Sequence, residues 1–181
     1  MAKPKFKCEQ CGKVMTALEI VEHDCMVAQA IVVPDVAGEI VGWRAWNVEG
    51  DEDVRLKSVT HTSYTWHPGT RFQIAECSLH ATEEIPAEKH SCGFYAAKTK
   101  EHLLSMSYHR YTDTDDVVIG EVALSGKVIP GTQGWRAQKA RIVRVYVPFE
   151  KWRLMRKIEE VYGVEVVLAN TLVDRTAKEV G

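Results

Sequence analysis

Residues 117–129 read VVIGEVALSGKVI, a run rich in β-branched residues that is typical of a β-strand. Gly120 and Gly126 lie inside this run, and a glycine within a strand indicates a bulge or the close approach of another backbone. A second run, RIVRVYV at 141–147, ends at Pro148. Because glycines allow strands to bend, this part of the chain predicts a strongly curved sheet.

The flanking sequence predicts more strands, at 27–33, 38–48, 54–60, 71–77 and 164–169. An acidic turn at 49–53 predicts a hairpin between the second and third of these strands. Residues 94–111 are predicted to be helical in their middle, and 149–162 form the clearest helix, with Gly163 as its C-cap. Since the strands come in runs and do not alternate with helices, the sequence predicts an α+β fold with a mainly antiparallel sheet and two helices.

Alternation along the strands predicts which side chains share a face of the sheet. On the strand at 38–48 we expect Val41, Trp43 and Ala45 to share one face. On the next strand, the expected face consists of Val54, Leu56, Ser58 and Thr60. Candidate core contacts from the segment 94–111 are Tyr95, Leu103, Leu104 and Tyr108.

The chain has 181 residues, 45% of them hydrophobic, and a net charge of −2, which predicts one compact domain with a small appendage. We place the appendage at 1–26 and the body at 27–181. No apolar run reaches the ~18 residues of a membrane span, and no apolar segment follows the basic start MAKPKFK, so we expect neither a membrane protein nor a secretory signal. An odd number of cysteines, five, favours a reducing compartment, and we expect a cytoplasmic protein.

Four potential metal ligands lie close together in the appendage. They are Cys8, Cys11, His23 and Cys25. A CxxC pair followed by a glycine turns two thiolates toward one centre, and three thiolates with one imidazole suit a tetrahedral zinc ion. The alternative is a redox CxxC pair, which normally opens a helix in a thioredoxin-like frame. We find no strand before Cys8 that would supply such a frame.

The residues FKCEQCGK at 6–13, followed by a predicted helix ending at His23, resemble single-zinc fingers of the CCHH and CCHC ligand classes. The eleven-residue spacer is also similar to that of ubiquitin-binding fingers. Those fingers usually keep three residues between the last two ligands, whereas one residue separates His23 from Cys25 here. The resemblance implies a zinc ion and leaves the partner of the finger open.

A second set of Cys and His residues lies in the body. It consists of Cys77, His80, His90 and Cys92, separated by the polar segment ATEEIPAEK. One zinc ion would hold the two ends of this loop together. Three interpretations remain open: a structural zinc, a metal with three protein ligands and an open catalytic position, or a buried cysteine beside solvated histidines. The sequence therefore predicts one zinc ion per chain, or two.

Charge is unevenly distributed along the chain. Residues 35–53 carry a charge of −5, and residues 127–157 carry +8, with Glu150 as the single acid. The basic residues of the second segment are interleaved with aromatic ones, a combination that binds nucleic acids. They are Lys127, Arg136, Lys139, Arg141, Arg144, Lys151, Arg153, Arg156 and Lys157. The alternative is a solvated surface on which Arg141 and Arg144 pair with the acidic hairpin of the same chain.

Four stretches of the body resemble uncharacterised small proteins of actinobacteria and their phages: GWRAW at 42–46, CGFYAAK at 92–98, GEVALSGKVI at 120–129 and GWRAQKA at 134–140. This resemblance implies an accessory protein, in the host cytoplasm if phage-encoded. We find no nucleophile elbow, P-loop or HExxH pattern. We therefore expect a non-catalytic zinc protein that binds nucleic acid. The alternatives are a protein-interaction module and a metal-dependent hydrolase or transferase.

Overall fold

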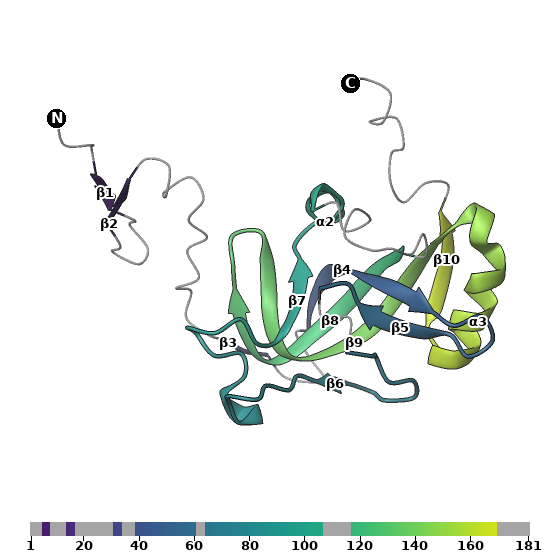
Figure 1. The fold of residues 1–181 in the computed structure, drawn as a ribbon, viewed down its shortest axis with the longest axis horizontal. Helices are drawn as coiled ribbons and strands as arrows, with labels where there is room; N and C mark the ends of the chain where they lie inside the picture. The colour runs from purple at the N-terminus through teal and green to yellow at the C-terminus, as the bar shows by residue number, and fades with distance from the viewer. Residues whose placement is uncertain are drawn as a thin grey trace, which may run out of the picture.

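The computed structural model describes residues 5–7, 14–16, 31–33, 39–60, 64–106 and 117–169 (Figure 1). Its body is built on an eight-stranded sheet with one short helix and one longer helix. The strands are β3 (Ile31–Val33), β4 (Ile40–Glu49), β5 (Arg55–Ser58), β6 (Gln73–Ile74), β7 (Phe94–Ala97), β8 (Val117–Pro130), β9 (Gly134–Pro148) and β10 (Glu165–Ala169). The helices are α2 (Lys100–Ser105) and α3 (Trp152–Tyr162), and two 3-10 turns are η1 (Thr82–Glu84) and η3 (Phe149–Lys151).

Four of the strands close into a ring. Strand β4 pairs with both β8 and β7, and β9 pairs with the same two strands. All these pairings are antiparallel, and only β10 lies parallel to its neighbour β9. The predicted α+β fold, with a curved and mainly antiparallel sheet and two helices, is confirmed for the described part of the chain. The predicted hairpin of β4 and β5 is also present.

The glycines of β8 allow this curvature. At Gly120 a Cβ atom would lie 2.2 Å from the carbonyl oxygen of Arg144 and 2.9 Å from the Trp46 ring, so a side chain has no room. Gly126 has a φ of +71° and lies where the register between β8 and β9 shifts, between Ser125 and Val128. The interpretation of these glycines as sites of a bulge and of close backbone approach is therefore confirmed.

The main core lies inside the ring and under α3. Trp46 and Trp66 are completely buried and meet edge to face, with ring centroids 5.4 Å apart. Leu56 from β5 and Ile158 from α3 are also completely buried in this core. Gly163 ends α3 with a φ of +63°, as predicted.

The two faces of β4 differ in burial. The face predicted to carry Val41, Trp43 and Ala45 forms a smaller core around Ala45 and leaves Val41 51% exposed, whereas Trp46 on the other face enters the main core. Thr60 is exposed, whereas Val54, Leu56 and Ser58 are buried as expected. The segment 94–111 is helical in its middle as predicted, at α2, but it begins with β7, where alternation turns the predicted core contact Tyr95 outward to 40% exposure.

Other predicted elements are present but begin or end at different residues. The strand expected at 71–77 is reduced to β6, and β9 begins before the expected strand, at Gly134. Helix α3 begins at Trp152, which is 49% exposed. The predicted core residue Tyr108 lies outside the described residues. The helices of the described residues are too short or too polar to cross a lipid bilayer.

Candidate metal centre

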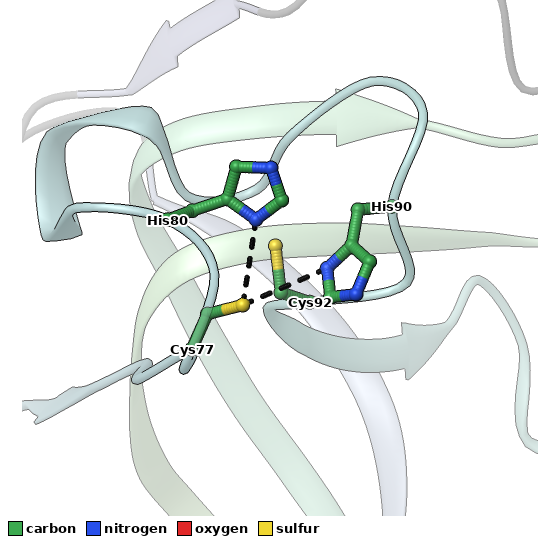
Figure 2. A group of neighbouring side chains, drawn as sticks. All are labelled: Cys77, His80, His90 and Cys92. Carbon is green, nitrogen blue, oxygen red and sulfur yellow. Dashed lines mark hydrogen bonds between the residues drawn. The ribbon is translucent and has the colours of Figure 1, made fainter.

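The second Cys/His set is brought together in space (Figure 2). One ligand atom from each residue, two sulfurs and two ring nitrogens, lies within 4.8 Å of every other. The residues are Cys77, His80, His90 and Cys92. The group can therefore hold a metal ion, which is one of the three arrangements that the sequence left open.

The distances within the group match a tetrahedral ion. Cys77 Sγ lies 3.4 Å from His80 Nδ1 and 3.6 Å from His90 Nδ1. A zinc ion with ordinary Zn–S and Zn–N bond lengths holds a sulfur and a nitrogen about 3.6 Å apart. The two imidazole rings are themselves adjacent, with centroids 4.8 Å apart. Small side-chain movements would thus complete the coordination.

The strand framework positions the two pairs of ligands. Cys77 follows β6, and Cys92 lies two residues before β7, so both ends of the loop start from strands that pair with β9. Gly93, which follows Cys92, has a φ of +112°. A Cβ atom there would lie 3.0 Å from Arg136 Cγ and 3.1 Å from the carbonyl oxygen of Ala137. The glycine in the predicted Cys-Gly turn is therefore required by both backbone conformation and space.

The loop between the two pairs is anchored to the sheet. Ile85 inserts into the main core and is completely buried. Gln138 Nε2 donates to the carbonyl of Thr82 at 2.7 Å, and Lys127 Nζ donates to that of Glu84 at 3.0 Å. The loop was predicted to be polar, and these contacts with the sheet were not predicted. Ile85, the one large apolar residue within it, is the signal that could have revealed them.

Arg136 lies beneath the ligand pair His90 and Cys92. Its Nη1 donates to both of their carbonyl oxygens, to that of Cys92 at 3.3 Å. The side chain is 2% exposed. Arg136 therefore cannot contact a nucleic acid in this fold, and its place in the predicted basic surface is corrected.

The surroundings of the Cys77 sulfur favour a thiolate. The pKa of the Cys77 thiol is lowered, first by its hydrogen bond with His80 and then by the backbone N–H of Leu79, which donates at 3.4 Å. The backbone N–H of Ala87 donates to Cys92 Sγ, also at 3.4 Å. Hydrogen bonds to a sulfur stabilise its charged form, which is the form that binds metals.

Other members of the predicted basic surface are engaged within the chain. Arg141 pairs with Glu39, with Nε to Oε1 at 2.9 Å and Nη2 to Oε2 at 2.5 Å. Arg144 binds Glu165 and lies near Glu121. The alternative, in which these arginines pair with the acidic hairpin, is confirmed for Arg141, whose partner Glu39 comes from the segment 35–53. It is wrong for Arg144, because Glu165 and Glu121 lie outside that segment.

The lysines and the remaining arginines of this segment differ in exposure. Lys157 Nζ donates to the carbonyl of Asp51. Arg153 and Arg156 are exposed on α3. Binding of nucleic acid by the exposed members stays a prediction.

The ligands predicted in the appendage, Cys8, Cys11, His23 and Cys25, lie outside the described residues. The structure does describe a two-stranded antiparallel sheet on either side of the CxxC pair. Strand β1 (Lys5–Lys7) pairs with β2 (Val14–Thr16), with Lys7 opposite Val14. Val14 is the first residue of β2.

Comparisons of the chain with protein-family models, with curated proteins and with solved structures find no match. The functional argument therefore depends on the geometry of the Cys/His group and its surroundings.

Proposed function

We propose that this is a zinc-binding protein in which the centre formed by Cys77, His80, His90 and Cys92 has a structural role. The convergence of all four ligand atoms within 4.8 Å carries the proposal. Two thiolates and two imidazoles are the ligands of many tetrahedral zinc sites. Calcium and magnesium prefer oxygen ligands, which this group lacks.

A structural role fits better than a catalytic one. A catalytic zinc usually has three protein ligands and keeps one position for water or substrate, whereas this group offers four. The ion would also join the two ends of the loop that connects β6 to β7. Fixing those ends reduces the conformational entropy that the loop otherwise retains.

A second zinc ion in the appendage is part of the same proposal. Pairing of β1 with β2 closes a hairpin over residues 8–13, which contain Cys8 and Cys11. The remaining ligands, His23 and Cys25, are the ones that the resemblance to zinc fingers implies.

Native mass spectrometry with elemental analysis of the full chain tests both sites. We expect two zinc ions per chain in the unaltered protein. The double variant Cys77→Ser/Cys92→Ser and the double variant Cys8→Ser/Cys11→Ser should each retain one. Ser91→Ala, between two ligands of the loop, is the matched control and should keep both.

The counts separate the two sites. A single zinc ion that is lost only from the Cys8/Cys11 variant would refute the loop centre. A chain without zinc, in which peptide mapping finds Cys77 joined to Cys92 by a disulfide, would also refute it.

A further inference from the structure

A cavity of about 320 Å³ lies among β4, β7, β9 and α2. Its volume is near the lower limit for pockets that bind small molecules, so it has room for a group of one or two fused rings. Tyr95 and Met106, which line it, are 40% and 37% exposed. Because exposed side chains form part of its wall, a group from solution can enter the cavity.

Aromatic side chains form much of the cavity wall. Trp43 and Tyr95 come from the neighbouring strands β4 and β7, and Trp135 lies near the start of β9. The indole of Trp43 is held in place by stacking on Tyr146, with ring centroids 5.4 Å apart. Aromatic rings that packing holds in place bind other flat aromatic groups by stacking.

Neutral polar side chains on the wall are accessible to solvent. Ser91 and Gln133 line the cavity, and both residues are exposed. Neither side chain forms a hydrogen bond with another described residue. A hydroxyl and a carboxamide both donate and accept hydrogen bonds. These groups match a ring whose edge carries donors and acceptors, as the edge of a nucleobase does.

Two lysines lie beside this aromatic wall. Lys98 Nζ is 4.9 Å from the ring centroid of Trp135, and Lys100 Nζ is 5.9 Å from that of Trp43. Neither lysine forms an ion pair with another described residue, and neither lines the cavity itself. Their ammonium groups can therefore bind a phosphate that remains outside the cavity while a ring occupies it.

We propose that the cavity binds one base of a single-stranded nucleic acid, with the base against the aromatic wall and the neighbouring phosphates on Lys98 and Lys100. A nucleotide joins an aromatic base to a phosphate, and the cavity places aromatic rings beside free ammonium groups. Because the phosphates stay outside, the strand can continue past the site. A duplex does not fit, since its bases are paired and stacked inside the helix.

The proposed site is distinct from the exposed arginines of α3, and it goes beyond the zinc centre. Fluorescence anisotropy of a labelled, mixed-sequence single strand of DNA with the zinc-loaded full chain tests it. The same sequence as a duplex and its free mononucleotides are the comparison ligands. We expect the single strand to bind at least tenfold more tightly than either. Absence of single-strand binding at low salt, or equal affinity for the duplex, would overturn the proposal. Equal affinity for the mononucleotides would overturn the choice of a strand.

Variants distinguish the cavity from α3. Tyr95→Leu should weaken single-strand binding about fivefold or more, because it removes a stacking surface. Trp152→Leu removes a 49% exposed aromatic ring of α3 and should leave the affinity unchanged. The opposite result, a loss only in Trp152→Leu, would overturn the site.

Salt dependence tests the two lysines separately from the fold. Lys98→Gln/Lys100→Gln should reduce the slope of log affinity against log salt by about 0.7 for each lysine. Arg153→Gln/Arg156→Gln, which removes two exposed arginines of α3, should leave this slope unchanged. An unchanged slope in the lysine variant would show that these lysines do not bind phosphates.

Photochemical crosslinking locates the base in the unaltered chain, so this measurement does not require a variant to fold. A strand in which iodouracil replaces thymine is irradiated with the zinc-loaded protein, and the modified peptide is mapped. We expect attachment at Trp43, Tyr95 or Trp135, and attachment at Trp152 instead would refute the site.

The zinc count of each protein is measured in parallel. A chain that holds the loop zinc but does not bind the strand refutes the cavity site alone. A chain that binds the strand without the loop zinc refutes only the metal proposal.

Discussion

The two halves of β9 carry arginines in opposite settings. In the loop half, residues 134–140, Arg136 is buried beneath the Cys/His loop and donates to backbone carbonyls. In the ion-pair half, residues 141–148, Arg141 and Arg144 are half-buried and bind glutamates. One strand thus holds an arginine that is enclosed among backbone carbonyls and two arginines that are half-buried and paired with glutamates.

This difference shows why charge counted along a sequence does not define a binding surface. The arginines of the ion-pair half have neutralising partners on neighbouring strands, so their charge is balanced within the chain. The guanidinium of the loop half meets carbonyl dipoles and the ring of Tyr95, and it forms no ion pair with another described residue. The predictions below compare the two halves, beginning with the largest effect.

Removal of zinc should affect the loop half most strongly. At a free zinc concentration about a thousand times Kd, binding to the folded chain alone contributes about 4 kcal/mol. For a protein of this size we expect chelation to lower Tm by roughly 8–16 °C. Calorimetry with and without chelator measures this effect in the Cys8→Ser/Cys11→Ser protein, where only the loop centre remains. An unchanged Tm there would contradict a structural role.

Loss of the Arg136 side chain should have the next largest effect. Arg136→Met leaves the carbonyls of His90 and Cys92 without their donor, and each such loss costs about 1–3 kcal/mol. The matched change Arg153→Met, on the exposed face of α3, should stay within about 0.5 kcal/mol. Urea unfolding of both variants gives the comparison. Equal stabilities would mean that Arg136 does not support the loop.

Breaking an ion pair in the other half should cost less. Arg141→Gln removes the bidentate partner of Glu39, whose side chain is 19% exposed, and we expect a loss of about 1 kcal/mol. Salt should reduce this difference because exposed charges are screened. Unfolding at low and high salt tests the assignment, and a loss that does not depend on salt would contradict an electrostatic origin.

The smallest effect is the pH dependence of the zinc-free loop. The pKa of Cys77 is lowered from its ordinary value of 9.0 in the folded chain, so the unfolded chain binds more protons between the two pKa values. Stability should therefore rise with pH through this window and reach its full value above 9.0. Cys77→Ser should flatten that part of the profile in chelator, as measured by unfolding at several pH values. If the stability of Cys77→Ser still rose with pH in this window, the pH dependence would come from another titratable group.

The pattern of residues along the chain was sufficient to predict much of the fold. Alternating apolar residues and internal glycines located β8, and helical spacing with a terminal glycine located α3. The helix predicted in the middle of 94–111 is α2, but the strand at the start of this segment was not predicted, because its apolar residues fit either period. The long-range pairing of β7 with β9 stabilises Phe94–Ala97 as a strand.

For the candidate site, spacing alone singled out all four loop ligands. It could not show that they converge, because the nine residues between His80 and His90 permit many loop shapes. Convergence depends on Ile85 in the core and on the hydrogen bonds from Gln138 and Lys127. The cavity was not foreseen, since its lining comes from segments far apart in the chain.

By itself, then, the sequence determined which residues bring metal-binding chemistry and which segments form strands, because both depend on local residue type and period. The tertiary structure alone decided where each charge lies. Burial and partners come from distant segments, and they make Arg136 an enclosed cation and Arg141 half of an ion pair.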